Sequence, residues 1–193
     1  MNLEAELTVC GEANDAAQAM QAVEKLHPDL VLLDMSLPGK GGLELLKDIR
    51  AVSPQTPVLI ISMHDETLYA ERVIKAGGRG FIMKQEGPEK IVQAVRKVLS
   101  GGISVSERIA AQILDAMSGG KSGTSSSIST LTDREFEVYR LLGQGKEPHE
   151  IARTLHLSIK TVDTHRAHIR QKLGLRNGTE LIHHATRWTA EQG

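Results

Sequence analysis

Residues 29–42 read DLVLLDMSLPGKGG, an aliphatic run that ends in aspartate and is followed by a segment with proline and glycine. Leu30–Leu33 has the length and composition of a short buried strand. Similar aliphatic runs occur at Leu7–Cys10, Val58–Ile61 and Gly80–Met83. Four such runs, each followed by a helical segment, predict parallel strands with right-handed crossovers, in a sheet that is covered on both faces.

The segments between the predicted strands carry apolar residues at helical spacing. The predicted helices are Ala16–Leu26, about Leu43 to Val52, Leu68–Ala76 and Pro88–Leu99. Pro88 suits a first helical position, and Gly101 and Gly102 suit the end of the last of these helices. Residues 1–102 are therefore predicted to form an α/β domain.

Residues 103–130 are predicted to link two domains. Ser106–Met117 has helical periodicity and presents Ile109, Ile113 and Leu114 on one side. Residues 118–130 contain three glycines and six serines, a composition that cannot bury enough apolar surface to order itself. The prediction is a linker helix followed by a flexible linker.

Residues 131–193 are predicted to be helical. The segment Thr132-Asp-Arg-Glu135 is a capping box, in which two side chains satisfy free backbone N–H groups at a helix start. Further helices are expected at Pro148–Leu155, at Ile159–Leu173 between a Ser158 cap and Gly174, and from a Thr179 cap to about Trp188. A helix, a tight turn and a second helix with cationic residues describe a helix-turn-helix reader of DNA, although an ordinary helical hairpin has the same spacing.

Charge and composition narrow the classes of function. Residues 160–176 hold five Lys or Arg residues against the single acid Asp163, which suits nucleic acid, although a solvated helix face would look the same. No apolar run approaches a transmembrane span, the N-terminus has no secretory pattern, and Cys10 is the only cysteine. We therefore expect a cytoplasmic protein without a membrane partner.

Polar residues follow three of the predicted strands: Asp34, Ser62 and Lys84. The carboxyl ends of parallel strands share one edge of a sheet, so we expect these side chains to lie close together. A carboxylate nucleophile, a hydroxyl and an ammonium can together accept and hold a phosphoryl group. Solvation of strand ends is the alternative reason for polar residues at these positions.

Two stretches resemble the receiver domains of two-component response regulators. Asp29–Gly42 is similar to the phosphoacceptor segment, and Gly80-Phe-Ile-Met-Lys84 is similar to the fifth-strand segment with its aromatic switch. The resemblance implies a flavodoxin-like α/β fold in which a sensor histidine kinase phosphorylates Asp34. It also implies that the Ser62 hydroxyl moves toward the phosphate, that the Phe81 ring reports the change, and that Lys84 binds the phosphate.

The chain departs from receivers at its beginning. Receivers have five strands in the order 2-1-3-4-5, and Leu7–Glu12 aligns with the second strand, so the first strand is missing. That strand would carry the acidic pair that binds Mg²⁺. Asp34 is therefore a metal ligand only if the pair is supplied, and we expect it to be phosphorylated poorly. Either the sequence begins at an internal methionine, or the receiver is degenerate and serves in dimerisation or partner binding.

Four separated motifs resemble the LuxR-type domain of NarL/FixJ regulators. They are Leu131-Thr-Asp-Arg-Glu135, Glu150-Ile-Ala152, Ser158-Ile-Lys-Thr-Val-Asp-Thr-His-Arg166 and Lys172-Leu-Gly174. The resemblance implies DNA binding as a homodimer. The residues implied to face base edges are Asp163, Thr164 and Ala167. Those implied to contact or orient phosphates are Lys160, Thr161, His165, Arg166, Arg170 and Lys172. Many relatives carry Lys in place of Asp163, and Asp can accept a hydrogen bond from cytosine N4.

The sequence thus predicts a DNA-binding transcriptional response regulator of a two-component phosphorelay. Its expected partners are double-stranded DNA and a sensor histidine kinase, and no enzymatic activity is expected. The alternative is a phosphorylation-independent regulator whose degenerate receiver serves only as an interaction surface. A third hypothesis, a phosphatase with Asp34 as nucleophile, lacks a second acid near Asp34 and a substrate-binding insertion.

Overall fold

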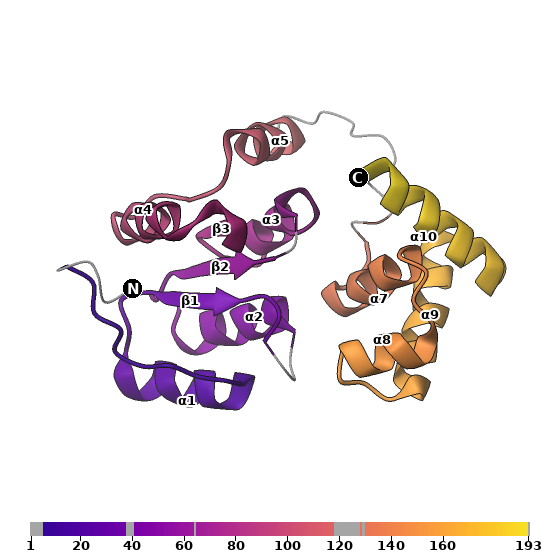
Figure 1. Ribbon diagram of the computed structural model, residues 1–193, viewed down its shortest axis with the longest axis horizontal. Helices are drawn as coiled ribbons and strands as arrows, with labels where there is room; N and C mark the ends of the chain where they lie inside the picture. Colours follow the sequence, from indigo (N-terminus) through magenta and orange to yellow (C-terminus); the bar gives the residue numbers. More distant parts are fainter. Residues whose placement is uncertain (1–5, 38–40, 64, 118–127, 129, 193) are drawn as a thin grey trace. The chain divides into compact units, whose positions relative to one another are not determined.

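The computed structural model describes residues 6–37, 41–63, 65–117, 128 and 130–192 (Figure 1). The chain forms two compact units, Met1–Gly120 and Lys121–Gly193. The described residues of the first are α/β, and those of the second are helical. Within these described ranges, no helix is both long enough and apolar enough to cross a membrane.

The first unit is built on a three-stranded parallel sheet. Its strands are β1 (Val31–Asp34), β2 (Val58–Ser62) and β3 (Gly80–Met83), in the spatial order β1-β2-β3. Leu33 is aligned with Ile60, and Ile60 with Phe81. These three strands confirm the predictions made from their aliphatic runs, including the parallel pairing.

Helices cover both faces of the sheet. Leu59 and Ile82 pack with α4 (Pro88–Leu99), and because side chains alternate across a strand, Ile60 and Phe81 face the other side, where they are buried. The other helices around the sheet lie close to the predicted helical segments. α1 is Ala16–Leu26 and packs against α2 (Gly42–Val52), which contacts β1, while α3 (Glu66–Lys75) contacts β3.

The predicted strand at Leu7–Cys10 is wrong. These residues lie outside the sheet, with Leu7 packed against the apolar cluster beside α4 and Val9 43% exposed. In the predicted order 2-1-3-4-5, a further strand separates this segment from β1, and no described residue takes that position. Without a neighbouring strand, the N–H and C=O groups of the segment have no ladder partners, so its aliphatic composition does not produce a strand.

A short segment after α4 closes the outer edge of β3. Ser104 forms an isolated parallel bridge with Gly80, and its carbonyl accepts from the Phe81 N–H at 2.9 Å. A Cβ on Gly80 would lie 2.5 Å from the Ser104 carbonyl oxygen, so only glycine allows this approach. α5 (Glu107–Met117), which the sequence places in the link between domains, packs against α3 through the buried Ile109. The Ser106 hydroxyl donates to Glu66 at 2.6 Å beside it.

The second unit contains four described helices: α7 (Asp133–Gly143), α8 (Pro148–Thr154), α9 (Ile159–Leu173) and α10 (Gly178–Gln192). α7 packs against both α9 and α10, and α8 packs against α9. The fully buried side chains that join them are Phe136, Tyr139, Ile151, Val162, Ile169 and Leu181. The ring of Trp188 meets Phe136 edge-on, with centroids 5.6 Å apart.

The helix ends of the second unit largely follow the sequence. The Thr132–Glu135 capping box is present, Ser158 accepts from the Thr161 N–H, and Gly174 ends α9 with a φ of 67°. The predicted Thr179 cap is wrong, because α10 begins at Gly178 and the Asn177 side chain accepts from the Glu180 N–H at 2.9 Å. The flexible linker predicted at residues 118–130 lies outside the described residues, apart from Ile128, which is buried, and Thr130.

Candidate functional site

Asp34 and Lys84 meet at the carboxyl edge of the sheet, as predicted from their places after β1 and β3. Asp34 is the last residue of β1, and Lys84 begins η1 (Lys84–Glu86), a single 3₁₀ turn. Lys84 Nζ donates to Asp34 Oδ2 at 2.6 Å, and both side chains are about one-third exposed. The Ser36 N–H donates to Oδ1 at 2.9 Å. An ammonium therefore neutralises the candidate nucleophile and lies within reach of any group bound to it.

Ser62 and Phe81 lie deeper in the same unit. Ser62 is the last residue of β2, aligned with Met83, and it is completely buried. Phe81 is 2% exposed. A group that arrives from solvent therefore meets Asp34 and Lys84 before it can reach the Ser62 hydroxyl.

The described residues do not fit a built Mg²⁺ site at Asp34. Mg²⁺ takes oxygen ligands in a near-octahedral arrangement, whereas the charged contact of Asp34 is an ammonium. Among the residues that the structure describes, no group of three His, Cys, Asp or Glu side chains could hold a metal. Asp15 caps α1 by accepting from the Gln18 N–H at 2.8 Å.

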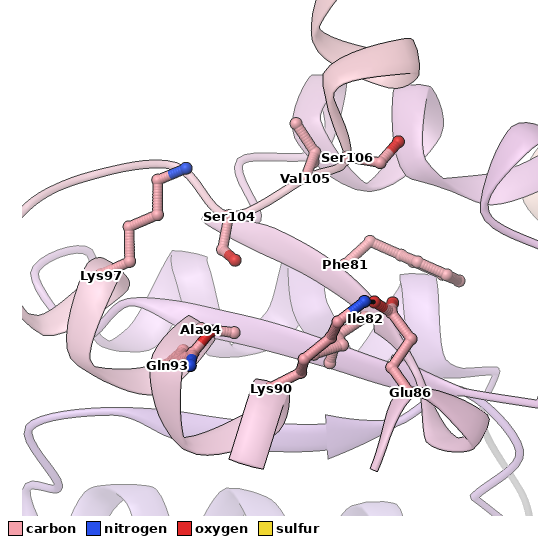
Figure 2. Close-up of a pocket in the computed structure, with 10 residues that line it drawn as sticks. All are labelled: Phe81, Ile82, Glu86, Lys90, Gln93, Ala94, Lys97, Ser104, Val105 and Ser106. Carbon is pink, nitrogen blue, oxygen red and sulfur yellow. Dashed lines mark hydrogen bonds and ion pairs between the residues drawn. The ribbon is translucent and has the colours of Figure 1, made fainter. Parts of the chain in front are cut away.

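A small cavity of about 210 Å³ lies beside Phe81, between β3, α4 and the segment before α5 (Figure 2). Glu86 and Lys90, which pair at 3.1 Å, stand at one side of it, and Ser104 and Lys97 at the other. Its lining contains none of Asp34, Ser62 and Lys84. The cavity is therefore separate from the candidate phosphoacceptor.

The exposed side of α9 carries the residues predicted to contact DNA. Asp163, Thr164 and Ala167, predicted to face bases, are all exposed. Of the predicted phosphate contacts, Lys160 and Lys172 are exposed, and Thr161, His165, Arg166 and Arg170 are partly buried. Val162 and Ile169 are fully buried and hold α9 against the core. The arrangement leaves a mostly polar helix face, with Lys160 on it, open to solvent, as a recognition helix requires.

Lys172 is engaged within the protein. Its Nζ donates to Oε2 of Glu135 at 2.6 Å, and Nδ1 of His168 lies 3.7 Å from the other carboxylate oxygen. Burial of Glu135 acts to raise its pKa, but hydrogen bonds from Lys172 and Thr132 outweigh burial, so the pKa lies below its usual value. The pair ties the end of α9 to the start of α7.

Another polar contact in the second unit joins α7 to α10. Nδ1 of His184 lies 2.7 Å from the Tyr139 hydroxyl, which also donates to the His184 carbonyl at 3.2 Å. Burial raises the pKa of Tyr139. Burial, with the nearby charge of Arg187, lowers the pKa of His184. Neither this contact nor the Glu135–Lys172 pair was predicted, because their partners lie 45 and 37 positions apart in the sequence.

Arg166 and Asp163 form an ion pair on α9, with Arg166 Nη1 2.9 Å from Asp163 Oδ1. This contact also escaped the sequence prediction, which treated the two residues one by one. The sequence nevertheless indicates this ion pair, because opposite charges three positions apart lie on the same face of a helix.

Comparisons with known proteins agree with both units. The model of the response regulator receiver domain matches residues 2–96, and that of bacterial regulatory proteins of the luxR family matches residues 129–185. The oxygen regulatory protein NreC of Staphylococcus aureus is 32% identical over 190 residues. The match covers 96% of this chain and 88% of NreC.

Solved structures agree as well. RcsB from Salmonella enterica serovar Typhimurium, bound to the rprA promoter with the phosphomimetic BeF₃⁻, is 26% identical with a TM-score of 0.57, over 93% of this chain and 85% of that one. A LuxR-family two-component response regulator from Aurantimonas sp. SI85-9A1 is 33% identical with a TM-score of 0.52, over 57% of this chain and 79% of that one. The chain belongs to the NarL/FixJ family of response regulators, and it is a DNA-binding transcription regulator of a two-component system rather than an enzyme.

Proposed function

We propose that α9 enters the major groove of double-stranded DNA with its N-terminal half at the base edges. The exposed residues of that half are Ile159, Lys160, Asp163 and Thr164, and the exposed Ala167 follows them. A recognition helix presents its first turns to bases, and its cationic side chains approach phosphates. The observation that carries the proposal is that the side of α9 opposite the buried Val162 and Ile169 is exposed and mostly polar, and that it presents Lys160 to solvent.

The salt dependence of binding tests this placement. The full chain first selects a duplex from a randomised pool, and its affinity is then measured over a range of salt concentrations. Lys160→Ala should weaken binding to every duplex and reduce the slope of log affinity against log salt by about 0.9. Lys75→Ala is the matched control, because Lys75 is 65% exposed and lies on α3. An unchanged slope for Lys160→Ala contradicts the proposal.

We further propose Asp34 as the phosphoacceptor. In transfer from a phosphohistidine of a sensor kinase, a carboxylate oxygen of Asp34 attacks phosphorus and forms a P–O bond, while the P–N bond breaks and its electron pair leaves with the imidazole. Lys84, whose Nζ is 2.6 Å from Oδ2, supplies one positive charge to the phosphoryl oxygens. Because the described part of the chain offers no cluster of acids for Mg²⁺, we expect this transfer to be slow.

DNA binding without phosphorylation is the second candidate, and the Asp34–Lys84 pair also supports it. The ammonium already neutralises the carboxylate, and Ser62 is closed to solvent. In this hypothesis the receiver serves in dimerisation or partner binding.

Labelled acetyl phosphate with Mg²⁺ separates the two candidates. A label that disappears in Asp34→Asn supports phosphorylation. An absence of label, in a protein that still binds its selected duplex, supports the second candidate.

Homodimerisation on DNA is the remaining part of the proposal. α10 is 15 residues long and leaves Ile182 43% exposed, which suits a helix-to-helix contact between two copies. Since its target is bacterial DNA, we place the protein in the cytoplasm. The mass of the complex on duplexes with one or two copies of the selected site measures the stoichiometry, and a single copy bound per double site contradicts a dimer.

A further inference from the structure

The Asp163–Arg166 ion pair lies where α9 is expected to meet the bases. The acid projects into solvent, with 56% of its side chain exposed, while the arginine is more enclosed, with 26% exposed. Both residues lie in the first two turns and a half of α9, the part of a recognition helix that reaches base edges. Of these two residues, the acid is therefore the one more accessible to DNA in the proposed placement, although DNA repels negative charge.

Arg166 is confined on its other side. A Cβ on Gly178, the first residue of α10, would lie 3.6 Å from Arg166 Nη2, so the guanidinium sits close to the start of that helix. Its Nε is buried and has no hydrogen-bond partner among the residues that the structure describes. A guanidinium held in this way has little freedom to swing toward a phosphate, so its positive charge acts on Asp163.

The ion pair reduces the electrostatic repulsion between the Asp163 carboxylate and the DNA phosphates. Oδ1 of Asp163 faces the guanidinium, which neutralises the carboxylate, and a carboxylate has a second oxygen that can accept another hydrogen bond. In the major groove cytosine offers its N4 amine as a donor, whereas thymine offers an O4 acceptor at the equivalent place. Asp163 can therefore bind cytosine and reject thymine.

We infer that Asp163 is a specificity-determining residue that reads a cytosine, and that Arg166 is a positioning residue that makes this reading possible by neutralising the acid. The inference rests on the proposed placement of α9 in the major groove. The side chain of Asp163 is 56% exposed, so its substitution leaves the fold intact and the effect on base choice can be measured.

Base preference is the first readout. The full chain and the Asp163→Asn variant each select duplexes from the same randomised pool, and affinities are then compared on the selected duplex with cytosine or thymine at the position that responds. Asparagine keeps the size of aspartate, but its amide can also donate to thymine O4. We expect the preference for cytosine over thymine to fall by roughly tenfold in the variant.

Rescue is the second readout. Arg166→Ala leaves the carboxylate of Asp163 uncompensated beside the phosphates, so binding to every duplex should weaken by about fivefold or more. Adding Asp163→Ala removes the repelling charge, so the double variant should bind more tightly than Arg166→Ala. Asp163→Ala should strengthen binding much less when Arg166 is present, because the guanidinium already neutralises the carboxylate. If Arg166 acted only as a phosphate contact or as a support of the fold, Asp163→Ala would have the same effect in both backgrounds.

Two results would overturn the inference: an unchanged base preference in Asp163→Asn, or an Asp163→Ala substitution that strengthens binding equally with and without Arg166. Trp188 fluorescence, from the single tryptophan, shows that each variant is folded. Lys160→Ala distinguishes this failure from failure of the proposed function. If Lys160→Ala loses affinity while the Asp163 variants keep their preference, only the inference fails. If Lys160→Ala also binds as the parent does, the placement of α9 fails.

Discussion

Lys172 Nζ lies 2.6 Å from Oε2 of Glu135, a carboxylate in a residue that is only 3% exposed. The same oxygen accepts from the Thr132 N–H at 2.8 Å, so one carboxylate completes the cap of α7 and holds the last turn of α9. A buried carboxylate is stable only when it is hydrogen-bonded and its charge is compensated. The position of α9, the proposed recognition helix, therefore depends on a residue at the start of α7.

Lys172→Ala is expected to destabilise the second unit by about 1–3 kcal/mol, because it leaves the buried Glu135 without its charged partner. Trp188 packs edge-on against Phe136, so a urea titration followed by tryptophan fluorescence reports on this unit. The control is Arg176→Ala, since Arg176 is 87% exposed and its pair with Glu180 lies in solvent, where an ion pair contributes little to stability. If the two variants lose equal amounts of unfolding free energy, Lys172 does not stabilise the unit by compensating the buried Glu135.

Acid should remove the contribution of the Glu135–Lys172 pair to stability. The pKa of Glu135 lies below its usual value of 4.5 in the folded protein, so the unfolded chain takes up a proton first as the pH falls. The stabilisation is therefore complete above about pH 4.5 and is lost between this pH and the lower folded pKa. The difference in unfolding free energy between the parent and Lys172→Ala should narrow over this range. A difference that stays constant down to pH 3 would show that Glu135 does not carry the effect.

Gly143→Ala is expected to destabilise the contact between α7 and α10. A Cβ at Gly143 would lie 2.6 Å from the Ala185 carbonyl oxygen and would also collide with the Thr189 hydroxyl. Since backbone atoms cannot move aside cheaply, the helices must separate, at a cost of about 1–3 kcal/mol. Gly178→Ala is the same substitution in α10, where the nearest atom is 3.6 Å away, and it should stabilise by about 0.5–1 kcal/mol. Urea unfolding followed by tryptophan fluorescence measures the change in unfolding free energy in both variants. Changes of the same sign would contradict the packing argument.

The parts of the fold that could be predicted depend on local patterns. Short aliphatic runs specified β1, β2 and β3, and because parallel strands end at one edge, the meeting of Asp34 with Lys84 followed from their positions. Side-chain caps at Thr132 and Ser158 were also local signals.

Predictions that needed a partner from elsewhere in the chain failed. Leu7–Cys10 has the composition of a strand, but pairing requires a neighbouring strand, which no local pattern reveals. Local patterns also miss the pairing of Lys172 with the buried Glu135, which is distant in sequence, while the role of Lys172 at a phosphate stays a prediction. Asn177 and Thr179 are both good cap residues, and the choice between them depends on where the preceding turn places the chain.

The contact between Tyr139 and His184 predicts how the second unit responds to mild acid. Burial and the charge of Arg187 lower the pKa of His184 below its usual 6.5, so the unfolded chain binds this proton more readily than the folded one. Neutral His184 makes its full contribution to the unfolding free energy above about pH 6.5. This contribution is lost as the pH falls toward the pKa of His184 in the folded protein. One such proton changes the unfolding free energy by at most about 1.4 kcal/mol per pH unit.

The chain has eight histidines, so the prediction concerns a difference between variants. His184→Asn should flatten the fall in stability between pH 7 and pH 5, measured by urea unfolding with tryptophan fluorescence. His183→Asn is the matched control, because His183 is the adjacent residue on α10 and is exposed. It should keep the slope of the parent, since an exposed histidine is hydrated equally in both states. If the two variants flatten the profile equally, burial beside Tyr139 is not the cause of the pH dependence.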